Sequence, residues 1–142
     1  MVSTVTSPYG FGVRLQVPHG EAVERTRAAL KEQGFGVLTE IDVRATLKQK
    51  LDVDYRPYII LGACNPPLAH RALQADPSIG LLLPCNVIIY EDGEGTVVEA
   101  MDPLVALGIA DVPALSAVAT EARQGLQQML VAVAGSVEGG GS

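Results

Sequence analysis

The sequence predicts a two-layer α+β domain, in which a five-stranded sheet packs against helices. Short alternating or wholly apolar runs bounded by turn residues are typical of strands, and a long apolar stripe near the C-terminus is typical of an amphipathic helix. The chain has 142 residues, 48% of them hydrophobic, which suffices for one core. We therefore expect one domain over residues 1–134 and a flexible glycine-rich tail over residues 135–142.

The first third of the chain alternates between strand and helix patterns. A strand is expected over residues 9–17, because apolar side chains there alternate onto one face. A turn that contains His19 separates this strand from a helix over residues 21–33, which ends at Gly34. A second strand is expected over residues 35–41.

The middle of the chain contains two helix-start signals around an apolar run. Asp42 is expected to cap a short helix. Residues 57–63 are apolar on both faces and predict a central strand. Asn65 then serves as an N-cap before Pro66 and Pro67, because proline needs no N–H partner in the first turn of a helix.

The last third contains two strand patterns and the longest helix pattern. Strands are expected over residues 85–91 and 96–101, joined by a hairpin turn at residues 92–95. Asp102 is expected in a turn after the second of these strands. A helix follows over residues 113–134. Its inward stripe is Leu115, Val118, Ala122, Leu126, Met129 and Val133.

Charge and hydropathy exclude several classes of partner. A net charge of −6 argues against nucleic-acid binding, which uses clustered Lys and Arg. No apolar run approaches the ~20 residues of a membrane span, and the N-terminus does not have the order of a signal peptide. We expect a cytoplasmic protein without membrane or nucleic-acid partners. Its positive mean hydropathy favours a homodimer, which would cover surplus apolar surface.

Two matched dipeptides, Cys64-Asn65 and Cys85-Asn86, are the most informative local feature. They hold the only two cysteines, and each lies beside a proline at the edge of an apolar run. Two cysteines in a chain of this size do not form a disulfide framework. The repeated pattern therefore suggests a site at the edge of the sheet.

The cysteines have two interpretations. Both are compatible with small buried side chains that fill tight strand ends. Alternatively, Cys64 lies just before a helix N-terminus, whose N–H groups and dipole would stabilise its thiolate, whereas Cys85 has no such helix. The topology decides whether they meet. Antiparallel strands would place both at one edge, and parallel strands would separate them by ~20 Å.

Other polar residues near the dipeptides are weaker candidates. Asn86 begins an apolar strand, where an unpaired buried amide costs roughly 1–3 kcal/mol, so it must find partners or an opening. His70 lies on the flank of the helix after Asn65 and is either an exposed residue or a base or metal ligand near Cys64. Cys64, Cys85 and His70 would supply three soft metal ligands, although no Cys-x-x-Cys spacing is present.

A set of spaced residues extends over most of the chain before the last helix. It comprises Gly34-Phe35, Glu40-Ile41-Asp42, Gly62 with Asn65-Pro66, Gln74 with Pro77, Gly80 with Leu83-Pro84, Glu91-Asp92 with Gly95, and Asp102-Pro103. In this order and spacing the residues resemble the prokaryotic family known as domain of unknown function 302. The chain looks closest to the branch in which Gly-Ala-Cys-Asn-Pro and Leu-Pro-Cys-Asn both occur, and in another branch the first segment has no cysteine.

This resemblance implies a fold rather than an activity. It implies a compact α+β domain similar to the TATA-binding-protein topology, with a curved, mainly antiparallel sheet, helices on one face, and frequent dimerisation. It also favours antiparallel strands at residues 57–63 and 85–91. The resemblance therefore implies that Cys64 and Cys85 share one edge of the sheet.

Two classes of function follow from these observations. In the first, the protein is a binding module that holds a small ligand or a soft metal ion through Cys64, Asn65, Cys85, Asn86 and His70. In the second, Cys64 is the catalytic thiol of a redox or transfer enzyme and Cys85 is its resolving partner. The sequence offers no evident general base, so binding is ranked first. A purely structural homodimer module is the simplest alternative, and no cofactor is indicated.

Overall fold

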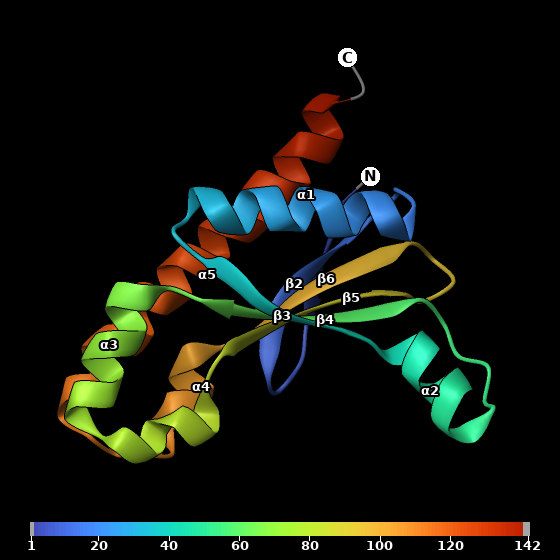
Figure 1. Ribbon diagram of the computed structural model, residues 1–142. Coiled ribbons are helices and arrows are strands. Elements are labelled where there is room, and N and C mark those ends of the chain that lie inside the picture. The colour runs from blue at the N-terminus through green and yellow to red at the C-terminus, as the bar shows by residue number, and fades with distance from the viewer. Residues whose placement is uncertain (1, 141–142) are drawn as a thin grey trace.

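The computed structural model describes residues 2–140, and its centre is a twisted sheet (Figure 1). The strands are β1 (Ser3–Thr6), β2 (Gly10–Leu15), β3 (Gly36–Asp42), β4 (Tyr58–Cys64), β5 (Cys85–Glu91) and β6 (Thr96–Met101). The helices are α1 (His19–Glu32), α2 (Val43–Leu51), α3 (Pro66–Ala75), the 3₁₀ helix η1 (Pro77–Leu82), α4 (Pro103–Gly108) and α5 (Pro113–Gly140).

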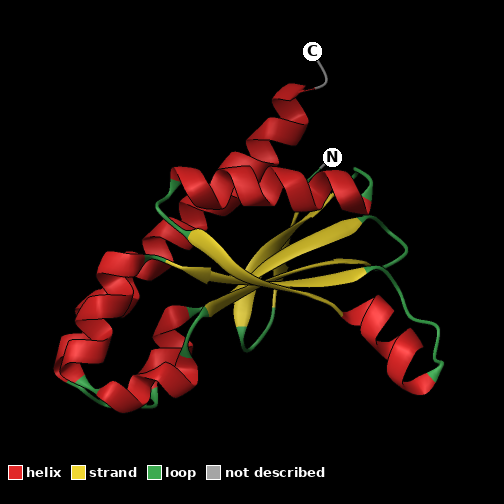
Figure 2. Cartoon of the chain, viewed as in Figure 1, coloured by secondary structure: helices red, strands yellow, loops and turns green. Residues whose placement is uncertain are grey.

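The sheet has the strand order β1-β2-β6-β5-β4-β3, and each neighbouring pair is antiparallel. Helices α1 and α5 lie across one face, whereas α3 and α4 lie beyond one end of the strands (Figure 2). The antiparallel arrangement of β4 and β5 is confirmed, with Ala63 opposite Cys85. The parallel alternative is therefore wrong.

The sheet contains six strands, so the prediction of five is wrong. The missed strand, β1, has four residues, three of them exposed, and pairs only with β2 at the edge of the sheet. An edge strand of this kind buries no apolar face, so it leaves no alternating apolar pattern, and only its Thr and Val content favoured a strand. The likeness to the TATA-binding-protein topology stays a prediction.

One helix start and two additional short helices also differ from the prediction. Helix α1 begins at His19, whose ring Nε2 lies 2.8 Å from the carbonyl oxygen of Ile89, so this residue is not in a turn. Asp102 caps the unpredicted helix α4 by accepting a hydrogen bond from the Leu104 N–H at 2.9 Å. Asp76 caps the unpredicted η1 in the same way. Each Asp-Pro pair thus begins a helical segment, and the turn predicted at Asp102 is wrong.

Helix α5 continues to Gly140, beyond its predicted end at Ala134. The Arg25 guanidinium donates a hydrogen bond of 2.7 Å to the carbonyl oxygen of Ser136, and Val137 packs against the core. These contacts with α1 and the core keep the chain helical over the first part of the predicted tail. Residues 141–142 lie outside the described residues.

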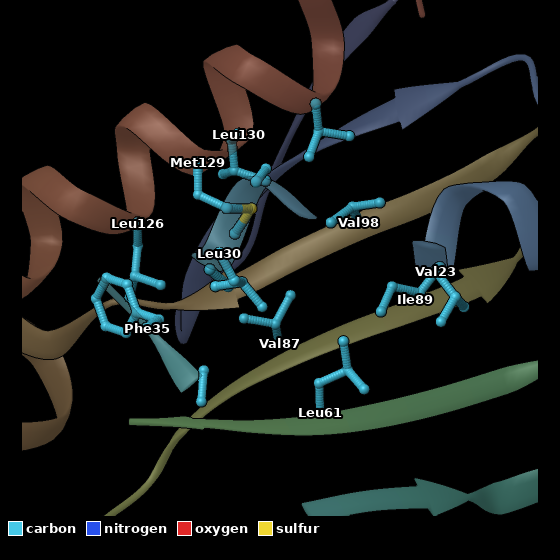
Figure 3. Packing of buried hydrophobic residues seen from close by; sticks show 14 of the residues in the cluster. Val23, Leu30, Phe35, Leu61, Val87, Ile89, Val98, Leu126, Met129 and Leu130 are labelled. Carbon is cyan, nitrogen blue, oxygen red and sulfur yellow. The ribbon is translucent and has the colours of Figure 1, made fainter. Parts of the chain in front are cut away.

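The main core lies between the sheet and the helices α1 and α5. Figure 3 shows Leu126, Met129 and Leu130 of α5 directed toward apolar side chains of the sheet and of α1. The predicted inward stripe of α5 is confirmed, because all six of its residues are buried. Labelled partners from the sheet and α1 are Val23, Leu30, Leu61, Val87, Ile89 and Val98.

A smaller apolar cluster, here called the end cluster, lies where α3, η1 and α4 pack against the N-terminal half of α5. Its buried members are Ala72, Ile79, Leu107, Leu115, Val118 and Ala119. Helix α5 therefore belongs to two apolar clusters, the end cluster through its first turns and the main core through its later ones.

Gly125 lies in α5 between the part that packs on the end cluster and the part that packs on the main core, and it faces the ring of Phe35. A Cβ at this position would lie 2.8 Å from the Phe35 Cε2, closer than carbon atoms pack. Glycine inside a helix costs roughly 1 kcal/mol relative to alanine. The close approach of α5 to Phe35 explains why glycine is accommodated here.

Candidate functional site

A cavity of about 300 Å³ lies beside α3, between the ends of three strands and the helices of the end cluster. Its walls come from β3, β4, β5, α3, η1, α4 and α5. The buried part of the lining is formed by Ala63, Ala72, Cys85, Leu107, Val118 and Ala122, and the exposed side chains of Leu38 and Leu73 lie at its mouth.

The two cysteines line this cavity from neighbouring strands. Strand β4 ends at Cys64 and β5 begins at Cys85, which pairs with Ala63 in the antiparallel ladder. Both thiols are free, Cys85 being buried and Cys64 half-buried. Burial raises the pKa of Cys85 to about 11, and the nearby Cys64 adds a smaller contribution. Cys85 is therefore a neutral thiol at pH 7.

Asn65 is the N-cap of α3, as the sequence predicted. Its side-chain oxygen accepts a hydrogen bond from the Leu68 N–H at 3.3 Å, and its carbonyl oxygen accepts one from the Ala69 N–H at 2.9 Å. Pro66 and Pro67 have no N–H to offer. No backbone N–H between residues 66 and 69 is thus free to face a ligand or a thiolate. A Cys64 thiolate stabilised by the dipole of α3 therefore stays a prediction.

Two of the predicted site residues lie outside the cavity. Asn86 is exposed, and its neighbour Cys85 is buried, because successive residues of a strand point to opposite faces of the sheet. His70 is exposed on α3 and does not line the cavity. The structure therefore unites Cys64, Asn65 and Cys85 and separates Asn86 and His70 from them.

The predicted metal-ligand trio is not assembled. Among the described side chains, those of residues 2–137, no group of three or more His, Cys, Asp or Glu is placed to hold a metal ion. The reason is the exposed position of His70, which leaves the two cysteines as the only soft donors at the cavity. His19 is also remote from it, on the first turn of α1.

Leu38 is a cavity residue that the sequence did not indicate. The register between β3 and β4 shifts between Val37 and Thr39, so Leu38 is an extra residue at a bulge. A bulge re-aims the side chain it contains, and Leu38 is 67% exposed at the mouth of the cavity. Regular alternation along β3 cannot reveal this position. The Asp76-Pro77 cap signal, in contrast, would have located η1, which contributes Gly80 to the lining.

These features define a small α+β protein with an apolar cavity at one end of an antiparallel sheet. The chain belongs to the family described as domain of unknown function DUF302, whose model matches residues 11–133. The resemblance seen in the sequence is therefore confirmed. Among residues 2–140, no helix combines the length and apolarity needed to cross a membrane.

A solved structure supports the same assignment. The crystal structure of an uncharacterized conserved DUF302 protein from Bacillus stearothermophilus is 30% identical to this chain, with a TM-score of 0.83. The likeness covers 89% of this chain and 99% of that one. No curated protein matches the chain.

Proposed function

We propose that this domain is a binding module that holds a small molecule in the cavity beside α3. The observation that carries the proposal is the cavity itself, which brings Cys64, Asn65 and Cys85 together within an otherwise apolar lining. A cavity of about 150 Å³ holds benzene, so about 300 Å³ suits a ligand of about twelve non-hydrogen atoms. This volume also lies at the lower end of the range of known ligand sites.

An organic ligand is favoured over a soft metal ion. Two thiols are a small donor set, and structural zinc sites use four ligands. Cys85 is protonated at pH 7 because its pKa is raised to about 11, so a metal ion would have to displace that proton. Metal analysis of freshly purified, unreduced protein tests this preference, and stoichiometric zinc or copper would reverse it.

A thiol-dependent enzyme is the alternative, and it rests on the two thiols that line one cavity. The lining contains no histidine or carboxylate to act as a general base. A neutral Cys85 would also be a slow resolving thiol, since the thiolate is the attacking species. Thiol titration of the unreduced protein addresses this alternative. Two free thiols favour the binding module, and a disulfide would favour redox chemistry.

Binding is tested with the small neutral fluorophore 1-naphthol, whose size matches the cavity, and a matched pair of variants on α3. Ala69 lines the cavity, whereas Ala75 is exposed on the same helix and does not. Phenylalanine at position 69 would fill much of the space. We expect saturable 1-naphthol binding in the wild type and in Ala75→Phe, and binding at least about tenfold weaker in Ala69→Phe.

Two results would contradict the proposal. One is the absence of saturable 1-naphthol binding to the folded wild type. The other is equal 1-naphthol affinity in Ala69→Phe and Ala75→Phe when circular dichroism shows that both variants are folded. In that second case 1-naphthol binds elsewhere on the surface.

The predicted homodimer is also retained as a proposal. It is supported by large apolar side chains on the surface of the single chain, among them Leu81, Ile109 and Tyr9, which are 88%, 78% and 76% exposed. Sedimentation at micromolar concentration tests it, and a monomer alone would contradict it. The cytoplasmic location and the lack of nucleic-acid partners stay predictions.

A further inference from the structure

We infer that the cavity beside α3 selects an uncharged, mainly apolar molecule with at most one neutral polar group, and that it discriminates against carboxylates, phosphates and amines. This inference rests on the proposed binding function and specifies its ligand class. Two independent features support it. The first is the composition of the lining, and the second is the N-terminus of α3, whose first turn has no free backbone N–H.

The lining contains none of the side chains that are ordinarily charged at neutral pH. None of its residues is Lys, Arg, His, Asp or Glu, and the buried Cys85 is a neutral thiol. A charged group that enters an apolar cavity loses its hydration and finds no opposite charge in exchange. Cations and anions are both disfavoured by this lining, and the net charge of −6 on the chain adds to the cost for anions.

The N-terminus of α3 does not supply the anion-binding groups that the lining lacks. The start of a helix ordinarily attracts anions through its free N–H groups. In α3, Pro66 and Pro67 lack an N–H, and those of Leu68 and Ala69 are bonded to Asn65. An anionic headgroup at this position would therefore find the helix dipole but no free backbone N–H in the first turn of α3.

The polar inventory of the lining sets the remaining chemistry. Among the lining residues, Asn65 has the only side-chain N–H donor, and its amide oxygen is already used to cap α3. The two thiols add only weak donors. One neutral acceptor on the ligand, such as a hydroxyl, ether or carbonyl oxygen, matches this single amide donor. The rest of the ligand would contact alanine, leucine and valine side chains.

The test compares three molecules that share one chain and differ in charge: 1-octanol, octanoate and octylammonium. The affinity of each is measured by its displacement of 1-naphthol from the wild-type protein at pH 7.5. We expect 1-octanol to bind at least about tenfold more tightly than either ion. Octanoate or octylammonium binding as tightly as 1-octanol would overturn the inference and leave the proposed function standing. Failure of all three, and of 1-naphthol, would instead contradict the proposed function.

A charge placed at the mouth sharpens the test. Leu73 lies at the mouth, and Leu81 is exposed but does not line the cavity, so Leu73→Lys and Leu81→Lys change the net charge equally. We expect Leu73→Lys to strengthen octanoate binding several-fold relative to 1-octanol and Leu81→Lys to leave that ratio unchanged. Equal changes in both variants would show that net charge governs selectivity and would overturn the role of the lining.

Discussion

The main core and the end cluster share the helix α5 but differ in how fully they are packed. Leu126 and Val133 in the main core and Leu115 and Val118 in the end cluster are all almost inaccessible to water. The end cluster borders the cavity of about 300 Å³ with Ala72, Leu107 and Val118, whereas the main core reaches the same cavity at its margin, through Ala63 and Cys85. A side chain can thus be fully buried and still face unfilled space, so burial alone does not locate the rigid part of a domain.

The sequence accounts for this difference through side-chain size. The main core combines β-branched and leucine side chains of the strands β2, β4, β5 and β6 with apolar side chains of the two long helices α1 and α5. The end cluster is built from α3, η1 and α4, which have ten residues or fewer. Several of the residues between them are too small to reach across the gap. They are Ala63, Ala69, Ala72, Gly80 and Ala122.

Truncation in the main core is expected to have the largest effect. Leu126→Ala removes a fully buried side chain between α5 and the sheet and should lower the free energy of unfolding by about 2–5 kcal/mol. Chemical denaturation monitored by circular dichroism measures this loss. A loss below about 0.5 kcal/mol would show that the α5 side of the core is not close-packed.

The boundary between the two regions is marked by Cys85, which belongs to the main core and also lines the cavity. Its pKa rises from the usual 9.0 to about 11 on folding, chiefly because of burial. The folded state therefore retains a proton that the unfolded state releases. The contribution of the Cys85 proton to the free energy of unfolding is fully present below pH 9. It is lost as the pH rises toward 11, and the loss amounts to at most about 2–3 kcal/mol.

The variant Cys85→Ala isolates this contribution. Its stability should fall less steeply between pH 9 and 11 than that of the wild type, whereas Cys64→Ala should keep most of the wild-type slope because Cys64 is the minor cause of the shift. Tyr58 and Tyr90 also have raised pKa values and remain in both variants. Identical slopes in all three proteins would mean that Cys85 is exposed to solvent.

A matched pair on α5 compares the packing of the two regions directly. Val133→Ala truncates a main-core side chain, and Val118→Ala makes the same exchange beside the cavity. We expect losses in the free energy of unfolding of about 2 and about 1 kcal/mol, respectively, because Val118 already lacks neighbours on one side. Equal losses in denaturant titrations would mean that the end cluster closes around the cavity in solution.

The smallest effect is expected for the ion pair between Arg71 of α3 and Glu121 of α5, which lies on the outside of the end cluster. Both side chains are about half exposed, so Arg71→Ala should change the free energy of unfolding by less than about 1 kcal/mol. A double-mutant cycle with Glu121→Ala measures the coupling. A larger coupling would mean that charge, rather than apolar contact, holds α3 against α5.

The sequence predicted those parts of the fold whose signals are local. The stripe of α5 and the capping role of Asn65 are properties of consecutive residues, and both are confirmed. Strand β1 and helix α4 were not predicted, because four and six residues are too few to show a strand or helix periodicity. Contacts with neighbouring elements decide their conformation. The true end of α5 was not predicted, because it depends on the contact of Arg25 with Ser136, which are far apart in the sequence.

The candidate site was predicted only in part. Cys64 and Cys85 line one cavity because β4 and β5 are antiparallel, which the family resemblance favoured. Grouping Cys85 with Asn86 failed for a reason that is visible in any strand, since adjacent side chains face opposite ways. Leu38 was beyond prediction, because a bulge depends on how two strands align rather than on the residues of either one.

The contact between Gly125 and Phe35 has an evolutionary consequence. Any side chain at position 125 would collide with the ring, and any smaller residue at position 35 would open a gap under α5. The two positions should therefore covary within the family: members with alanine or serine at the equivalent of Gly125 should carry an aliphatic residue in place of Phe35. Substitutions at this crossing point should then be accepted in pairs rather than singly.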